Sequence, residues 1–375
     1  MDSATEERLL QVFQDLHERP ERGWEEKQTT AYLVEFLQRE GFEPQPFSDM
    51  TGLYVDIGEG EPTVGFRTDI DALWQEVNGT FQANHSCGHD GHMTVALGVA
   101  LELKKALADG AVRLLFQPAE ETGQGAKAIL EEGIIDSLDF LYGTHVRPLT
   151  ELTDGTYAPA IQHGAAKMIQ GEISGTEAHG ARPEEGVNAI EVASALVEAL
   201  KRIWIPSSAS GSVKMTQLQA GGASGNVIPG QATFQLDIRA QDNETMEALT
   251  AGLKRAINAV ATLYGARITT NVKAEMVAAQ TDTAAKNILQ QAITEVAGND
   301  ALQTGIVTPG GEDFHFYSYA KPDLHTTMLG IGCGVIPGLH HPEMTFNRER
   351  LPVAAKIIAR ALLLTLQKQQ ELAYD

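Results

Sequence analysis

The chain has 375 residues, more than one hydrophobic core usually holds, so the length predicts two domains. Its formal net charge of -22 at pH 7 argues against nucleic acid and anionic membranes as partners, because both attract basic surfaces. The amino-terminal segment lacks the apolar stretch of a secretory signal, and the two cysteines are too far apart in sequence to form a disulfide framework. These features favour a cytoplasmic location, and no apolar run approaches the roughly 18 residues of a membrane span.

Short apolar runs alternate with amphipathic segments through the first part of the chain. The spacing of apolar residues predicts helices over 4–18, 25–39, 93–107 and 125–132. The intervening runs predict strands over 53–57, 64–66, 112–116 and 140–143. Such alternation indicates an α/β layer around a mixed, largely parallel sheet.

Near residue 165 the pattern changes to strand, helix, two strands, helix and strand. The predicted ranges are 165–173, 187–203, 212–219, 232–239, 244–262 and 267–273. This order predicts a small α+β sandwich with an antiparallel sheet. The α/β pattern then resumes, with a helix at 283–296, a strand at 326–330 and a helix at 351–368. We therefore expect a catalytic domain over 1–164 and 278–375, interrupted by an inserted domain over 165–277.

The segment 83–94 is the densest group of chemically active residues. Cys87, His89 and His92 lie two and three residues apart, and glycines between them give the backbone freedom to turn the side chains inward. A thiolate and imidazoles this close can bind Zn²⁺ or a neighbouring first-row cation. The alternative is a histidine-rich turn with a buried, inert thiol. The density of polar residues favours a metal site.

Acidic and histidine side chains also follow three of the predicted strands. Asp69 and Asp71 come after the strand at 64–66, the pair Glu120 and Glu121 after 112–116, and His145 after 140–143. Ligands of open α/β sheets bind beyond the carboxyl ends of the strands, so these side chains are expected at one edge. Each could instead be a solvated loop charge, but three such strand ends together favour a site.

Two adjacent carboxylates can divide the work of a metal hydrolase. One of Glu120 and Glu121 can bind the metal while the other takes a proton from a water activated by it. Two exposed glutamates at a helix start are the alternative. Among the remaining histidines, His340 and His341 are candidates because they lie in a Gly- and Pro-rich loop after a strand. His179 stands alone in the insert, and spacing does not single it out.

Seven motifs then follow one another in a recognisable order. They are Asn84-His-Ser-Cys-Gly-His-Asp-Gly-His92, Phe116-Gln-Pro-Ala-Glu-Glu121, Gly143-Thr-His145, Gly175-Thr-Glu-Ala-His179, Gly225-Asn-Val-Ile-Pro229, Gly311-Glu-Asp-Phe314 and Leu339-His-His-Pro342. Together they resemble the M20 metallopeptidase family, in its aminoacylase and amidohydrolase branch of N-acyl-amino-acid and hippurate hydrolases. The run from Phe66 to Glu76 looks most like the AmhX-type amidohydrolases. The resemblance extends over nearly the whole chain.

The resemblance implies a role for individual residues. The family's ligands for two metal ions match Cys87, His89, Glu121, His145 and His340. Glu120 matches its general base, and His179 matches a residue that crosses the dimer interface and stabilises the oxyanion. Asn226 and Arg239 fall near positions that hold the substrate carboxylate, and Asp71 matches an aspartate behind the ligands. His92 matches no ligand of the family, which overrides the argument from its spacing.

The resemblance also implies the architecture and the reaction. It implies a catalytic domain like that of the zinc exopeptidases, with a ferredoxin-like insert that serves as lid and dimerisation domain of a homodimer. Two divalent ions per subunit, Zn, Mn, Co or Ni, would support hydrolysis of the amide bond of a small N-acyl amino acid. A dipeptidase or carboxypeptidase of the same family, or a non-catalytic metal-binding relative, are the alternatives.

Three positions depart from the commoner family pattern. Ser86 replaces an alanine before the cysteine, Trp74 stands where proline is frequent, and His341 replaces a frequent serine. None of them is a proposed ligand or the base. A tryptophan at position 74 could alter the substrate pocket, so the resemblance does not fix which N-acyl amino acid is cleaved.

Overall fold

A computed structural model describes residues 1–374, with side chains through Glu371. The chain divides into two compact units. Unit 1 consists of Met1–Gln162, Gln280–Val307 and the chain from Asp313 onward, and unit 2 of His163–Ala279 and Thr308–Glu312. Within the described residues, no helix combines the length and apolarity that a membrane span requires.

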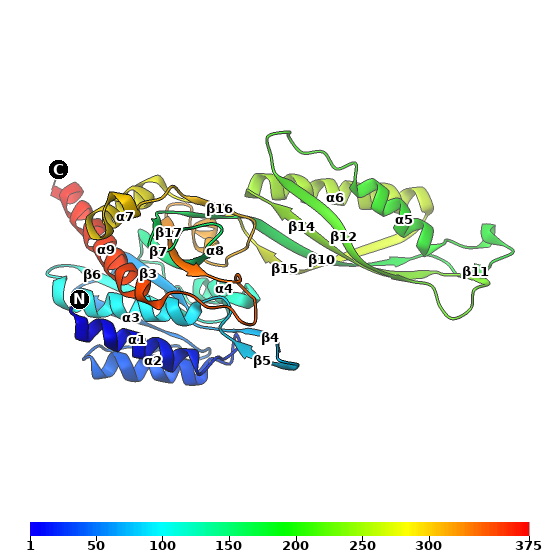
Figure 1. The fold of residues 1–375 in the computed structure, drawn as a ribbon. Helices are drawn as coiled ribbons and strands as arrows, with labels where there is room; N and C mark the ends of the chain where they lie inside the picture. The colour runs from blue at the N-terminus through cyan, green and yellow to red at the C-terminus, as the bar shows by residue number, and fades with distance from the viewer. Residues whose placement is uncertain (375) are drawn as a thin grey trace. The chain divides into compact units, whose positions relative to one another are not determined.

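Unit 1 is built on a mixed seven-stranded sheet in the order β1-β2-β6-β3-β7-β17-β8 (Figure 1). The four strands β6, β3, β7 and β17 run parallel, and the pairings at both edges are antiparallel. The bounds are β1 Gln45–Pro46, β2 Leu53–Gly58, β3 Val64–Asp69, β6 Ala111–Gln117, β7 Phe140–Pro148, β8 Tyr157–Ala158 and β17 His325–Val335. The predicted α/β class with a mixed sheet is confirmed.

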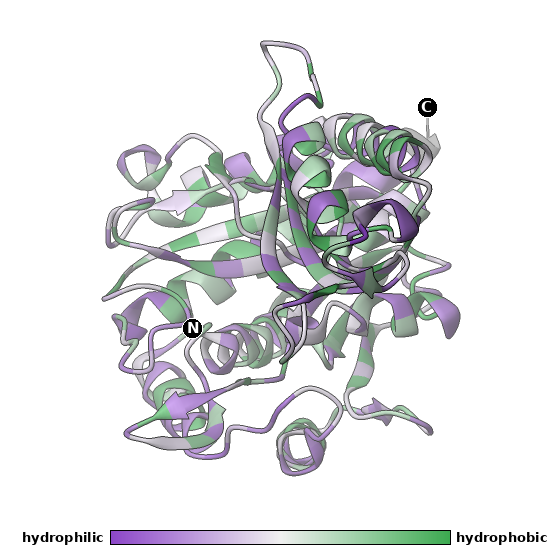
Figure 2. Ribbon diagram, turned by 90° about the vertical axis from the view of Figure 1, so that its right-hand side faces the viewer, coloured by the Kyte–Doolittle hydropathy of each residue, from purple (hydrophilic) through white to green (hydrophobic). Residues whose placement is uncertain are grey.

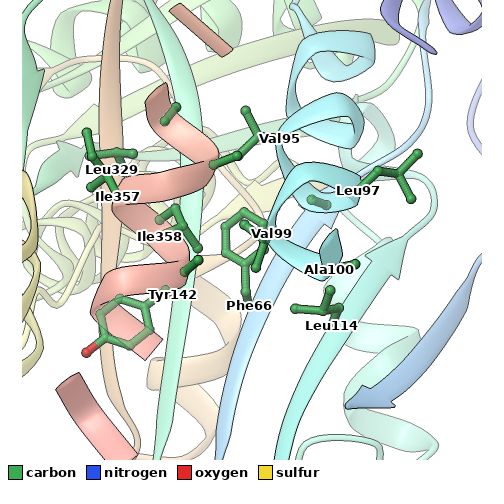
Figure 3. Close-up of a cluster of buried hydrophobic side chains, with 14 of the residues drawn as sticks. Phe66, Val95, Leu97, Val99, Ala100, Leu114, Tyr142, Leu329, Ile357 and Ile358 are labelled. Atoms are coloured by element: carbon green, nitrogen blue, oxygen red, sulfur yellow. The ribbon is translucent and has the colours of Figure 1, made fainter. Parts of the chain in front are cut away.

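The helices of unit 1 bury their apolar faces against this sheet and against one another. They are α1 Ser3–His17, α2 Lys27–Arg39, α3 His89–Ala106, α4 Gly125–Glu131, α7 Thr283–Ala297, α8 His315–Ala320 and α9 Leu351–Tyr374. Helix α3 is buried on all sides from His89 to Leu101, although its first residues are polar. Figure 3 shows Val95 and Val99 of α3 beside Phe66 of β3 and Ile358 of α9. In Figure 2, hydrophilic and hydrophobic residues alternate along the more exposed helices.

Several predicted boundaries differ from the structure, and two of the differences concern residues of the predicted site. Helix α3 begins at His89 rather than at 93, because Gly88 adopts the left-handed φ of 87° that starts the helix. Gly91 therefore lies within the helix, where an added Cβ would approach the Phe346 ring at 3.0 Å. Its role is close packing rather than loop freedom. Strand β7 continues to Pro148, so that His145 lies within the strand and not after it.

A hairpin outside the main sheet was missed by the sequence analysis. It consists of β4 (Leu73–Val77) and β5 (Thr80–Asn84), paired antiparallel (Figure 1). Asn78 and Gly79 form its turn with φ of 52° and 79°, as a type I′ turn requires. An Asn-Gly pair between two short strands is a strong hairpin signal, so the sequence did contain this information.

Unit 2 has the predicted order of strand, helix, two strands, helix and strand. The elements are β10 Ala165–Ser174, α5 Ala189–Leu200, β12 Gly211–Ala220, β14 Gln231–Ala240, α6 Asn243–Tyr264 and β15 Arg267–Met276. The strands form an antiparallel sheet in the order β12-β14-β10-β15, which is the ferredoxin-like arrangement. Alternate residues of β14 are buried beneath α5 and α6. Two short strands, β11 (Ala178–His179) and β13 (Val227–Ile228), pair beyond this sheet.

Candidate functional site

Five of the predicted metal ligands converge in unit 1 from four separate segments. Cys87 precedes α3 and His89 begins it. Glu121 lies in the 3₁₀ turn Glu120–Thr122 after β6, His145 lies in β7, and His340 lies in the loop after β17. Three of these segments continue from parallel strands, whose carboxyl ends meet at one edge of the sheet. The five residues are Cys87, His89, Glu121, His145 and His340.

The ligand atoms form two overlapping triads. Those of Cys87, His89 and His145 lie within 4.8 Å of one another, and so do those of Cys87, Glu121 and His340. Cys87 Sγ is 3.5 Å from His145 Nε2, and Glu121 Oε1 lies 3.9 Å from His89 Nε2 and 3.8 Å from His340 Nε2. Cys87 belongs to both triads. His340 is the one half-exposed member, with 56% of its side chain accessible.

Hydrogen bonds fix which nitrogen of each histidine faces the cluster. His89 Nδ1 donates to the Asp71 carbonyl at 3.0 Å and to its carboxylate at 3.1 Å. His145 Nδ1 donates to the Val146 carbonyl at 2.6 Å. A carbonyl oxygen only accepts, so each Nδ1 carries a proton and each Nε2 presents its lone pair to the cluster. Asp71 also accepts the Glu121 N–H at 3.0 Å and so contacts two of the five.

Two atoms at the centre of the cluster are buried without a hydrogen bond. They are His89 Nε2 and Glu121 Oε1. A buried polar atom left unpaired costs about 1–3 kcal/mol, so such pairs of orphaned acceptors mark a missing positive partner. Sulfur, imidazole and carboxylate donors together suit Zn²⁺ and its first-row neighbours. The residues present therefore fit a divalent cation.

Burial shifts the pKa values of the two acidic ligands, Glu121 and Cys87, away from the ionised forms that bind metal. It raises the pKa of Glu121 to about 8, although the nearby His89 opposes the shift. It also raises the pKa of the Cys87 thiol, with the Glu121 carboxylate adding to the effect. Ligation requires the thiolate and the carboxylate, so a cation that binds here must displace protons.

The Glu120 carboxylate lies beside the cluster and is also buried, with 6% exposure. One oxygen accepts the Asp313 N–H at 3.3 Å, and the other is 3.9 Å from His89 Nε2. The two adjacent glutamates thus both reach the cluster, with Glu121 in the triad that contains His340. This arrangement leaves Glu120 able to face a water beside the ligands.

His92 has no lone pair available for a metal. Its Nδ1 donates to Asp69 at 2.8 Å, and its Nε2 accepts the Val146 N–H at 3.0 Å. The spacing argument for His92 as a ligand therefore fails on its contacts. The same Asp69 carboxylate accepts from the fully buried Arg67 at 2.9 Å, and Arg67 also donates to Asp313 at 2.6 Å. The sequence analysis assigned Arg67 no role. A charged residue inside an apolar strand was the available signal.

Unit 2 carries the other three predicted residues, at two different places. His179 and Asn226 are exposed neighbours, because β11 pairs with β13 and Gly180 N–H donates to the Asn226 carbonyl at 2.7 Å. His179 Nδ1 accepts the Ala181 N–H at 3.0 Å, so its neutral ring carries the proton on Nε2 and can donate it. Arg239 lies eight residues along β14 from Gln231, about 26 Å away at the rise of a strand. Within a single copy of unit 2, Arg239 therefore lies far from His179 and Asn226.

A polar clip holds the loop of His340 against Cys87's segment. The Ser86 hydroxyl donates to the Gln75 side-chain oxygen, and the Gln75 amide donates to the His340 carbonyl at 3.3 Å. His340 N–H donates in turn to the Ser86 carbonyl at 2.6 Å. These contacts restrain His340 in a left-handed conformation with a φ of 65°, which residues other than glycine seldom adopt. The unusual Ser86 thus has a structural use.

The model of the peptidase family M20/M25/M40 matches residues 65–364. The chain belongs to peptidase family M20. It is 31% identical to the N-acetylcysteine deacetylase of Bacillus subtilis (strain 168), over 98% of this chain and 99% of that protein. It is also 31% identical to the hippurate hydrolase of Campylobacter jejuni, over 69% of this chain and 71% of that protein.

Two solved structures share the fold over nearly the whole chain. A Bacillus subtilis protein described as a dinuclear metal-binding peptidase superposes with a TM-score of 0.81 at 28% identity, covering 98% of this chain and 99% of that one. A Staphylococcus aureus protein described as a putative aminohydrolase gives a TM-score of 0.87 at 24% identity, covering 96% and 97%. The predicted family and fold are confirmed.

Proposed function

We propose that this M20 protein is a metal-dependent amidohydrolase that cleaves the amide bond of N-acyl amino acids. The observation that carries the proposal is the pair of ligand triads that share Cys87, with the Glu120 carboxylate beside them. The relatives named as N-acetylcysteine deacetylase and hippurate hydrolase support this substrate class, since both names describe the removal of an acyl group from an amino acid.

We propose that the cluster holds two divalent cations. Cys87, His89 and His145 would hold one, and Cys87, Glu121 and His340 the other. When bound, such ions polarise an acyl carbonyl and lower the pKa of water towards neutrality. The described dinuclear peptidase of the family supports the number of ions. The donor set is compatible with Zn²⁺, Mn²⁺, Co²⁺ or Ni²⁺.

The residues of the chain would carry the proton and the charge of the reaction. Glu120 takes a proton from the attacking water, whose oxygen bonds to the acyl carbon, and returns it to the nitrogen as the C–N bond breaks. His179 Nε2–H donates to the oxyanion that develops on the acyl oxygen. Asn226 and Arg239 would hold the carboxylate of the substrate. The products are a carboxylic acid and an amino acid.

A second copy of the chain would complete the site. His179 and Asn226 lie beyond the Gln231 end of β14 and Arg239 lies near its other end, so one copy of unit 2 does not bring all three residues to one substrate. Strand β12 is an edge strand that can pair with a partner, and Leu218 on it is exposed. A groove of about 470 Å³ between β12 and α5 is lined by apolar side chains such as Val197, Val213 and Met215, together with lysine, threonine and glutamine residues. These features support a homodimer formed through unit 2.

Removal of the metal should abolish hydrolysis. We expect chelator-treated protein to lose turnover of N-acetyl amino acids and to regain it with at least one of Zn²⁺, Mn²⁺, Co²⁺ or Ni²⁺, because the orphaned His89 and Glu121 atoms need a cation to be satisfied. A panel of N-acetyl amino acids, hippurate and dipeptides with each metal restored measures this. Faster turnover of dipeptides would contradict the assigned substrate class. Metal-independent turnover would contradict the mechanism.

The Ser86 clip should set the affinity for the ion near His340. Ser86→Ala removes the hydroxyl that holds Gln75, so we expect about tenfold weaker binding of the second ion, as for other residues that support a ligand. Calorimetric titration of metal-free protein with one cation measures both binding steps. Ser48→Ala, on an exposed serine, is the matched control. Equal affinities in all three proteins would show that the clip has no such role.

A further inference from the structure

Glu26 is a buried carboxylate that the proposed reaction does not use. It precedes α2, its side chain is fully buried, and its partners are uncharged. One oxygen accepts the Ala119 N–H at 2.8 Å, and the other is 2.5 Å from the Thr51 hydroxyl. Burial raises the pKa of Glu26 to about 7, even though both hydrogen bonds oppose the shift. Burying a carboxyl group without a charged partner costs free energy, so we expect its position to serve a function.

The residue that Glu26 holds lies immediately before both glutamates of the site. Ala119 has φ of 55° and ψ of 38°, the left-handed conformation that costs about 1–2 kcal/mol in residues other than glycine, asparagine and aspartate. The 3₁₀ turn with Glu120 and Glu121 begins at the next residue. The direction of both carboxylates therefore depends on the backbone of Ala119, which a hydrogen bond to its N–H restrains.

The segment around Glu26 is anchored to the site at further points. The Glu21 backbone carbonyl accepts the N–H of Ala72, the residue after Asp71, at 2.8 Å. The Glu21 carboxylate accepts the Thr29 N–H near the start of α2 at 2.8 Å. Gly23 packs against the turn so closely that an added Cβ would lie 3.0 Å from the Ala119 Cα. Residues 21–26 thus contact the loops after β3 and β6, which carry the acidic groups of the site.

We propose that Glu26 is the positioning residue of the Glu120–Glu121 turn. Its carboxyl group holds Ala119 in the left-handed conformation, and thereby directs Glu121 into the metal triad and Glu120 towards the attacking water. The claim that Glu26 directs Glu120 towards the attacking water rests on the proposed function. The claim that Glu26 directs Glu121 into the metal triad concerns metal binding alone, so it is tested without substrate.

The variants separate the hydrogen bond from general stability. Glu26→Gln keeps an oxygen that accepts the Ala119 N–H, whereas Glu26→Ala leaves that N–H buried and unpaired. Tyr142→Phe is the matched control, because it removes a buried hydrogen bond to Thr365 in the core of unit 1 and leaves the contacts of Glu26 in place. Thr51→Val frees one Glu26 oxygen and serves as a second, milder test.

For Glu26→Ala we expect about 10- to 100-fold lower kcat at nearly unchanged KM, and about tenfold weaker binding of the second Zn²⁺ by calorimetry. Glu26→Gln should recover most of both, Tyr142→Phe should change neither, and Thr51→Val should show a smaller loss of the same kind. Wild-type kcat and Zn²⁺ affinity in Glu26→Ala would overturn the proposal. If Glu26→Ala does not fold, wild-type kcat and Zn²⁺ affinity in Thr51→Val would overturn the proposal, because the Thr51 hydroxyl fixes the carboxylate that holds Ala119. If the wild-type protein cleaves none of the substrates, the Zn²⁺ titrations still decide the position of Glu121.

Discussion

Glu120→Gln should lower kcat by about 10²–10⁴-fold while both metal ions remain bound, because a general base contributes that much to proton transfer. The amide has nearly the shape of the carboxylate and can still accept the Asp313 N–H, so the turn should keep its conformation. It cannot take a proton from water. The rate of hydrolysis of an N-acetyl amino acid at saturating substrate measures the loss.

The metal content of the variant is the control that gives this result its meaning. Glu121, and not Glu120, belongs to the triad with Cys87 and His340, so elemental analysis should find two ions per subunit in Glu120→Gln as in the wild type. Glu61→Gln, on an exposed glutamate, should leave both quantities unchanged. Near wild-type turnover with the metals bound would remove Glu120 from the role of base. Loss of an ion would identify it as a ligand.

The sequence predicted those parts of the site that depend on residue type and local order. The alternation of apolar runs placed the strands, and acidic or histidine residues after three of them indicated one edge of a sheet. These inferences depend on short-range periodicity, which a single chain displays directly. The resemblance to the M20 family added His179, which spacing alone would have left aside.

Other features could not be predicted because their causes lie far apart in sequence. The polar run at the start of α3 resembled a loop, yet two of its side chains are paired within the fold, His92 with Asp69 and Asp90 with His17 at 2.6 Å. A lone glutamate before a helix likewise gives no sign of burial. Glu26 is buried because Thr51 and the turn after β6 close over it, and only the tertiary structure brings these segments together.

The insert is the part of the molecule where sequence, structure and mechanism can be tested together. His179→Ala should lower kcat by about 10²–10³-fold with both ions still bound, since loss of one oxyanion donor has this effect in other acyl-transfer enzymes. The side chain is exposed, and its ring accepts one local hydrogen bond, from Ala181 N–H. Unfolding of the variant should therefore follow that of the wild type. Unequal thermal stability would indicate a structural role instead.

Co-expression of His179→Ala with Glu120→Gln decides whether the donor comes from the second subunit. In a mixed dimer, the His179→Ala subunit keeps its own Glu120 and receives an intact His179 from the Glu120→Gln subunit. One of the two sites of the dimer is therefore complete, and the other lacks both residues. Random pairing makes about half of the dimers mixed, and the mixture should regain about a quarter of wild-type activity. Co-expression of Glu120→Gln with Glu120→Ala should regain none, because each site then lacks its base. If the first mixture is no more active than its two parts, the oxyanion donor belongs to the same chain as the metal ligands, and the exposed position of His179 needs another explanation.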